Sequence, residues 1–305
     1  MRSSLPDGFT LRDVTEADAS VVAEVMNAYD AAFGTGEVVS EGDVRSSWAD
    51  LGDRGSASLA LDGQGAPAGY VEIFLRGEET GLDGYVHPER FDHGLGDAFV
   101  TLGERRASEL GSASVVAGTL AADARATELF TDRGWRQERV FLRMSIDLRG
   151  DEARPRPPDG LVLRLFRAED ARGFHAAREE AFADHWNHHP ESFEEYRRRT
   201  MEADDFDPML WWVVEDGAEI AAILRCTAVR FGGGWVDSLG VRPRWRRRGL
   251  GELLLRTAFA EFARRGERRV ALGVDAQNAT GATQLYDRVG MQVAFHANVF
   301  RKELE

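Results

Sequence analysis

The chain has 305 residues, of which 43% are hydrophobic and 30% charged, so it exceeds the usual length of one domain and is expected to contain two. Its formal net charge of −14 disfavours a nucleic-acid partner, because binding to a phosphate backbone depends on Lys and Arg. No apolar run approaches the roughly 20 residues that cross a bilayer, and residues 1–10 lack a signal-peptide pattern, so we expect a cytoplasmic protein with no membrane partner.

Groups of residues in the first half of the chain recur in the same order about 155 residues later. They are Leu11-Arg12 and Asp18-Ala19 with Leu163-Arg164 and Asp170-Ala171, Val86-His87-Pro88 and Gly94-Leu95-Gly96 with Val241-Arg242-Pro243 and Gly249-Leu250-Gly251, and Ala126, Leu129 and Gly134 with Ala282, Leu285 and Gly290. Anchors in one order indicate duplication of a whole domain. We expect a first domain over residues 1–148, a proline-rich linker over 149–160 and a second domain over 161–305.

The second copy begins with a pattern of one strand, two helices and three strands. These are expected over residues 161–166, 170–182, 192–201, 210–214, 219–229 and 235–241. Glu215-Asp216-Gly217 suits the turn of a hairpin between two of the strands. Cys226, the single cysteine, lies in an apolar run and is interpreted as a buried strand residue rather than a nucleophile.

An amphipathic helix follows from Leu250 to Phe262, and Gly266 is a good terminator for it. Next come a buried strand, a last helix and a closing strand, over residues 270–274, 279–289 and 293–301. The first copy is expected to be laid out alike. The predicted fold class is therefore α/β, with two tandem mixed, mainly antiparallel sheets flanked by helices.

The segment from Arg246 to Gly251 joins the end of a strand directly to the start of a helix. Its two glycines let the backbone approach a ligand closely, and the free N–H groups of the helix N-terminus suit a pyrophosphate. A glycine pair also suits a bare turn, and an arginine run also suits a solvated loop. The preceding strand with Pro243 and the amphipathic helix after the loop favour the ligand site.

These residues resemble two signatures of the GNAT superfamily of N-acetyltransferases. One is the loop Arg246 to Gly251, and the other is similar to Asn278 to Met291, with Ala282 displaced by one position. The doubled arrangement resembles the mycothiol synthase branch of that superfamily. The resemblance implies acetyl-CoA as co-substrate, no metal, and a V-shaped split between the strands that end at Val241 and near Val274.

The resemblance also implies the residues that contact the coenzyme. They are Leu239, Gly240, Val241, Arg246, Arg247, Arg248, Gly249, Leu250, Gly251, Glu252, Asn278 and Thr283. Among them, Leu239 and Val241 would offer backbone groups to the pantetheine arm and the acetyl carbonyl. Asn278 has an alternative role as the N-cap of the last helix.

Tyr286 matches the general acid of the family by position. A phenol is ordinarily a weaker acid than a thiol, so we expect the Tyr286 hydroxyl to act mainly as a hydrogen-bond donor. The alternative is that the Tyr286 ring only packs against its neighbours. The branch implies a glutamate where this chain has Trp235 and a tyrosine near Gly273. Asp237 points to the same side of the strand as Trp235 and is the candidate base, with a solvated aspartate as the alternative.

Residues 184–191 hold three histidines between the first two helices of the second copy. No cysteine or second histidine cluster completes a coordination sphere, so the sequence predicts no metal site. The family places this loop beside the acceptor, which makes His185, Trp186 and Trp235 the candidate acceptor-binding residues. A solvated surface loop is the alternative.

The expected reaction is direct attack by a primary amine, of a small molecule, on the thioester. Alternatives are a non-catalytic acyl-CoA sensor or scaffold, and acetylation of a protein N-terminus or lysine. A monomer or a homodimer is expected. The first copy has Phe130 at the position that matches Tyr286, Ala122 at that of Asn278 and Phe91 at that of Arg246. Because phenylalanine has no hydroxyl, we expect only the second copy to be catalytic.

Overall fold

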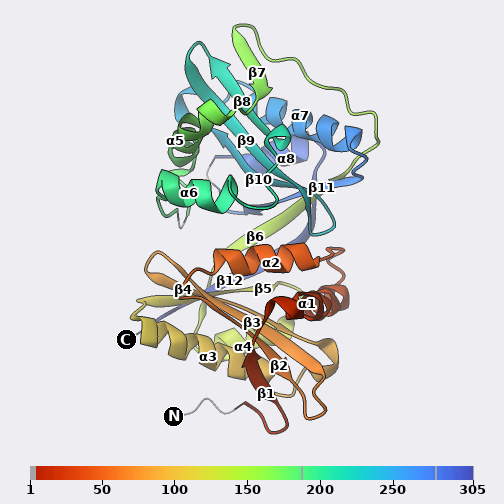
Figure 1. Ribbon diagram of the computed structural model, residues 1–305, viewed down its shortest axis with the longest axis vertical. Coiled ribbons are helices and arrows are strands. Elements are labelled where there is room, and N and C mark those ends of the chain that lie inside the picture. Colours follow the sequence, from red (N-terminus) through yellow and green to blue (C-terminus); the bar gives the residue numbers. More distant parts are fainter. Residues whose placement is uncertain (1–4, 187, 279, 305) are drawn as a thin grey trace. The chain divides into compact units, whose positions relative to one another are not determined.

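The computed structural model describes residues 5–186, 188–278 and 280–304, so residues 1–4, 187, 279 and 305 lie outside it. The chain folds into two units: unit 1 comprises Met1–Phe141 and Phe295–Glu305, and unit 2 comprises Leu142–Ala294. Each unit is a mixed sheet flanked by helices, and the predicted α/β class is confirmed (Figure 1).

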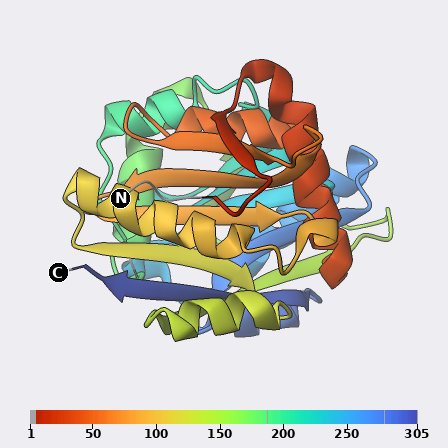
Figure 2. The ribbon, with the colours of Figure 1, turned by 90° about the horizontal axis from the view of Figure 1, so that it is seen from below.

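The sheet of unit 1 has the strand order β1-β2-β3-β4-β5-β12. Its strands are β1 (Thr10–Asp13), β2 (Ser56–Leu61), β3 (Pro67–Arg76), β4 (Glu79–Val86), β5 (Ser114–Leu120) and the later part of β12 (Gln292–Glu303). Its helices are α1 (Ala19–Phe33), α2 (Glu41–Asp50), α3 (Leu95–Leu110) and α4 (Ala124–Asp132). Figure 2 shows α1 and α2 on one face of these strands and α3 and α4 on the other.

The sheet of unit 2 has the strand order β6-β11-β10-β9-β8-β7. Its strands are the later part of β6 (Arg136–Asp147), β7 (Leu161–Leu165), β8 (Trp211–Asp216), β9 (Glu219–Arg230), β10 (Gly233–Val241) and β11 (Arg269–Asp275). Its helices are α5 (Ala171–Phe182), α6 (Phe193–Thr200), α7 (Leu250–Arg264) and α8 (Ala282–Arg288). The predicted elements of the second copy are thus present, and Ala279, the expected first residue of the last helix, lies outside the described residues.

The two units do not coincide with the two sequence copies. The closing strand expected at 293–301 was assigned to the second copy, but β12 pairs antiparallel with β5, from Ala297↔Leu120 to Glu303↔Ser114, in unit 1. In return, residues from Leu142 onward pack into unit 2, where Met144 is 1% exposed in the core. Both copies end in strands of similar pattern, so backbone pairing rather than sequence decides which sheet each strand completes.

The same ion pair ties the first strand to the first helix of each unit. Arg12 bonds Asp18 at 2.6 Å in unit 1, and Arg164 bonds Asp170 at 2.6 Å in unit 2. The hydrogen bond from Arg164 lowers the pKa of the Asp170 carboxyl, which also accepts the backbone N–H of Arg167. Equal contacts at matched positions support the duplication inferred from the sequence.

The core of unit 2 is rich in aromatic side chains. Phe174 of α5, Trp211 and Trp212 of β8, Trp245 and Phe262 are each at most 2% exposed. Within the described residues, no helix combines the length and apolar character that a membrane crossing requires.

Candidate active site

Strands β10 and β11 of unit 2 run parallel but pair only where they begin. The paired residues are Gly234 with Val270 and Trp235 with Ala271. β10 continues to Val241 and keeps its antiparallel pairing to β9 over that length. Beyond Trp235, the edge of β10 that faced β11 has no strand partner among the described residues, and the Val241 carbonyl at its end accepts a hydrogen bond from Arg246 Nε at 3.3 Å.

A bulge lies in β10 just after the point of separation. Val236 pairs with Cys226 and Ser238 with Arg225, which makes Asp237 the extra residue. The Asp237 carboxylate is 3% exposed and accepts a hydrogen bond from Thr227 at 2.9 Å. It also pairs with Arg225 at 3.0 Å and Arg230 at 3.4 Å. Asp237 therefore lies on the open strand as predicted, but as an ion-paired group rather than a solvated one.

The predicted phosphate loop connects β10 to α7 through backbone angles that favour close approach. Arg247 has φ 64° and Gly249 has φ 77°, both in the left-handed region. The first intrahelical bond runs from the Leu253 N–H to the Gly249 carbonyl, so the preceding N–H groups of the first turn have no acceptor within the helix. Such a turn at a helix N-terminus is an anion-binding arrangement.

Trp245, directly before the loop, is 1% exposed and anchors the loop in the core of unit 2. Its indole N–H donates to the Asp216 carboxylate at 2.8 Å, and this bond lowers the pKa of Asp216. Arg248 approaches the same carboxylate at 3.4 Å. The loop is thereby fixed to the turn between β8 and β9.

The arginines of the loop differ in what they contact. Arg246 turns back to α5, donating to the Ala181 carbonyl at 3.1 Å and to Asp184 at 3.2 Å. Arg247 is exposed, and the side chain of Glu252 bonds Arg256 at 2.8 Å. Leu250 is 1% exposed in the core, so only its backbone faces the loop. The predicted coenzyme contacts here therefore rest on backbone N–H groups more than on side-chain charge.

Gly251 was predicted from the sequence as a coenzyme contact, and the structure shows that it also has a role in packing. A Cβ at this position would lie 2.7 Å from Leu285 Cδ2, so the Leu285 side chain of α8 packs directly on α7 at Gly251. The next residue on α8 is Tyr286, which is 8% exposed. Burial raises the pKa of Tyr286 to about 12, and none of the described residues donates to or accepts from its hydroxyl in a recorded hydrogen bond.

Asn278 does not cap α8, so the predicted alternative role is wrong. The N-cap of α8 is Gly281, with φ 76°, and the helix begins at Ala282. Asn278 instead accepts the backbone N–H of Thr280 at 2.8 Å, because asparagine side chains close turns of this kind. Thr283 lies in the first turn of α8 and is partly buried. Contact of Asn278 and Thr283 with the coenzyme stays a prediction.

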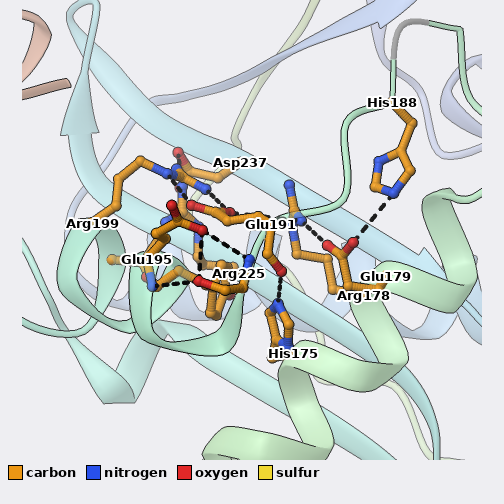
Figure 3. A network of polar contacts seen from close by, with 12 residues as sticks. His175, Arg178, Glu179, His188, Glu191, Glu195, Arg199, Arg225 and Asp237 are labelled. Atoms are coloured by element: carbon orange, nitrogen blue, oxygen red, sulfur yellow. Dashed lines mark hydrogen bonds and ion pairs between the residues drawn. The ribbon is translucent and has the colours of Figure 1, made fainter. Parts of the chain in front are cut away.

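Charged side chains join α5, the 188–195 segment and α6 (Figure 3). Glu179 of α5 contacts Arg178 at 2.5 Å and His188 at 3.3 Å. Glu191 contacts Arg199 of α6 at 2.7 Å, and its backbone carbonyl lies 2.9 Å from His175 Nε2. The segment between the helices is thus held by a charge network, which the histidine spacing alone did not indicate.

The histidines of this segment do not converge. The His185 ring lies 4.5 Å from the Phe182 ring, and burial, with Arg246 second, lowers its pKa. His188 pairs with Glu179, and His189 is exposed. Among the described residues no group of three or more His, Cys, Asp or Glu side chains is arranged to hold a metal ion. Asn187 lies outside the described residues.

One side chain near the split comes from the first half of the sequence. The Arg143 guanidinium of β6 lies 4.4 Å from the centre of the Trp235 ring and 5.1 Å from that of Phe231. Its Nη1 would be 3.4 Å from a Cβ on Gly273. Arg143 therefore fills the space beside the two positions where the sequence departs from the branch it resembles. No local signal places it there, because β6 reaches this sheet only through tertiary pairing.

Comparisons with known proteins agree with this geometry. The model of the Acetyltransferase (GNAT) family matches residues 173–291. A mycothiol acetyltransferase from Geodermatophilus obscurus is 31% identical over 297 residues, covering 92% of this chain and 94% of that protein. The crystal structure of a GCN5-related N-acetyltransferase from Sphaerobacter thermophilus has a TM-score of 0.82 at 31% identity, covering 98% and 97% of the two chains. A tandem GNAT protein from the clavulanic acid biosynthesis pathway shares the fold, with a TM-score of 0.74 at 15% identity over 97% and 98%.

The split strands, the loop at the helix N-terminus and these similarities define the class of the protein as an N-acetyltransferase. The resemblance inferred from the two signatures is confirmed. The chain belongs to the GNAT family, with its similarity to the mycothiol acetyltransferases extending over nearly its whole length.

Proposed function

We propose that the protein transfers an acetyl group from acetyl-CoA to a primary amine of a small molecule, at a site in unit 2. The observation that carries the proposal is the opening of β10 from β11 toward the loop at Arg247 and Gly249. Free backbone groups along β10 suit an extended pantetheine arm, and the first N–H groups of α7 suit its diphosphate. The binding energy of the coenzyme would thus come from groups already in position.

In the proposed reaction the amine nitrogen attacks the thioester carbonyl carbon, a C–N bond forms and the C–S bond breaks. A proton leaves the amine and the departing sulfur gains one, so the net transfer is from nitrogen to sulfur. Because burial raises the pKa of Tyr286 to about 12, full transfer of its proton to an ordinary thiolate would cost roughly 5 kcal/mol. Tyr286 therefore acts by donating a hydrogen bond to the sulfur as negative charge develops.

Asp237 is the proposed base, acting on the amine through a water. Its carboxylate lies in the bulge of β10, two residues after Trp235, which is the last residue of β10 that pairs with β11. Arg225, Arg230 and Thr227 surround the Asp237 carboxylate and fix its orientation. The amine is therefore proposed to contact a water and not the carboxylate itself. A relay through water fits this enclosed placement.

The acceptor is proposed to bind between Trp235 and the 184–191 segment, with His185 and Trp186 on the far wall. Relatives named mycothiol acetyltransferase make an amine from mycothiol metabolism the first acceptor to test. Because the proposed acetyl donor, acetyl-CoA, is a cytoplasmic metabolite, we also propose a cytoplasmic location for the protein.

The test is a panel of acceptors incubated with acetyl-CoA, with thiol release and product mass as readouts. The panel combines small primary amines, including those of mycothiol metabolism, with peptides that present a free N-terminus or lysine. Thiol release matched by an acetylated small amine is expected. Acetylation of peptides alone would overturn the small-molecule acceptor, and no release with any acceptor would overturn acetyl-CoA dependence.

A further inference from the structure

Unit 1 retains the frame of the coenzyme site described in unit 2. Its parallel strands β4 and β5 pair only from Glu79 with Ser114 to Leu82 with Ala117, and then separate. The following loop repeats the left-handed angles, with φ 63° at Asp92 and φ 82° at Gly94. The backbone alone would therefore allow a second coenzyme site.

Side chains of unit 1 cross this split from one flank to the other. Tyr29 of α1 donates its hydroxyl to Asp123, the N-cap of α4 after β5, at 3.1 Å. Its ring meets that of Tyr85 on β4, edge to face, at 5.5 Å. Tyr29 is 7% exposed and Asp123 is 5% exposed, so this bridge is inside the unit and not on its surface.

A second bridge closes the loop end of the split. The Arg125 guanidinium, at the start of α4, lies 3.5 Å from the centre of the Phe91 ring in the loop after β4. It lies 5.8 Å from the Phe33 ring of α1 and within 3.5 Å of the Asp123 carboxylate. The guanidinium thus ties the start of α4 to the loop that precedes α3.

The matched positions in unit 2 carry small residues. In the register of the duplication, Tyr29 corresponds to Ala181, Tyr85 to Gly240 and Arg125 to Gly281. The first two also face each other in unit 2, because a Cβ on Gly240 would lie 3.0 Å from the Ala181 Cβ. Where unit 2 carries one methyl group and two glycines, and α5 packs closely on β10, unit 1 places a phenol, a second phenol and a guanidinium.

We propose that unit 1 is closed to coenzyme by its own side chains, Tyr29, Tyr85 and Arg125, and that each chain binds a single acetyl-CoA, in unit 2. The inference rests on the proposed function only for the identity of the coenzyme. It goes beyond the loss of catalytic residues, since Phe130 in place of Tyr286 would stop chemistry but leave binding intact.

Calorimetric titration of the wild-type protein with acetyl-CoA tests the proposal directly. One coenzyme per chain is expected, and two would overturn the closure of unit 1. No binding at all would instead overturn the proposed function, so the two failures differ. Hydrogen exchange locates the site: protection on adding acetyl-CoA is expected in peptides covering residues 239–252 and not in those covering 84–96. The opposite pattern would overturn the proposal.

The triple variant Tyr29→Ala, Tyr85→Gly and Arg125→Gly copies all three small residues of unit 2 into unit 1. A second acetyl-CoA per chain is expected, because the separated strands and the loop of unit 1 are already in place. Wild-type hydrogen-exchange protection of the core strands β2 and β3 shows that unit 1 of the variant is folded. A folded variant that still binds one coenzyme would show that these side chains are not what excludes it. The wild-type exchange experiment stands independently if the variant does not fold.

Discussion

Burial distinguishes the Tyr286 hydroxyl from that of a surface tyrosine. Desolvation raises its pKa to about 12, so the phenol keeps its proton through neutral and mildly alkaline pH. A neutral hydroxyl can donate a hydrogen bond to a sulfur that is gaining charge, which a phenolate cannot do. Phe130, at the matched position of unit 1, fills a similar space without that proton.

We expect Tyr286→Phe to lower kcat by roughly 10²-fold or more, the range of a lost acid or hydrogen-bond donor in a transition state. Acetyl-CoA affinity should be unchanged, because the ring remains. The matched control is Tyr196→Phe, the same chemical change at a tyrosine of unit 2 that is 1% exposed. Steady-state kinetics of both variants check this. Near-full activity of Tyr286→Phe would remove the hydroxyl from the mechanism.

We expect Asp237→Asn to lower turnover most at low pH, where the amine is mainly protonated and assistance from a base matters most. The substitution also leaves Arg225 and Arg230 without their shared carboxylate, so some stability is lost. Asp170→Asn removes another largely buried, arginine-paired carboxylate of unit 2 and controls for that loss. Its pH-rate profile should keep the wild-type shape. A profile of Asp237→Asn that overlays the wild type would show that Asp237 is not the base.

At the scale of elements, the contact between α7 and α8 sets the distance from the phosphate loop to Tyr286. We expect Gly251→Ala to lower both the melting temperature and kcat, because the new Cβ would lie 2.7 Å from Leu285 Cδ2 and the Leu285 side chain, next to Tyr286, must move to relieve the contact. Overpacking of this kind costs about 1–3 kcal/mol.

The duplication supplies a control for this effect. Gly96→Ala places a Cβ at 3.3 Å from Leu129 in unit 1, where a small adjustment relieves the contact. A smaller loss of stability and an unchanged kcat are expected there. If Gly251→Ala leaves kcat and the melting temperature at wild-type values, close approach of α7 to α8 does not position Tyr286.

Elements with strong periodic patterns could be predicted from the sequence, whereas cross-strand geometry could not. The helix after the loop was expected from Leu250 and is observed as α7, Leu250–Arg264, because its apolar face and Gly266 are local signals. The ion pairs of Asp237 depend on a bulge that shifts β10 against β9 by one residue. The alternative capping role of Asn278 is filled by Gly281, since both residue types suit helix ends.

At the scale of the whole molecule, the doubling of the fold was visible in the sequence but the exchange of closing strands was not. β12 completes the sheet of unit 1, and the end of β6 completes that of unit 2. Pairing between strands far apart in the chain carries no local pattern beyond alternation. The placement of Arg143 beside Trp235 follows from this exchange and could not be predicted without it.

The five tyrosines of the chain predict how its stability responds to alkali. Burial raises the pKa of each: Tyr29, Tyr70, Tyr85, Tyr196 and Tyr286. The folded state therefore holds phenolic protons that the unfolded state releases above its pKa of about 10. Stability is fully present below that pH and is lost as pH rises further.

We expect the unfolding free energy in urea to be steady from pH 7 to 9 and to fall above about pH 10. Phenolate absorbance should appear only at the higher pH where the protein unfolds, because the buried phenols ionise on unfolding. Phenolate absorbance that develops near pH 10 in a protein that is still folded would contradict the burial of these hydroxyls.

The measurement that tests the central claim most directly is acetyl transfer by a matched pair of loop variants, Gly249→Val and Gly94→Val. Both glycines have left-handed angles, φ 77° and φ 82°, so the two substitutions introduce similar backbone strain. If the reaction belongs to unit 2 alone, Gly249→Val loses most of kcat/KM for acetyl-CoA while Gly94→Val keeps the wild-type value. Full activity of Gly249→Val with loss of activity in Gly94→Val would place the reaction in unit 1 and contradict the assignment.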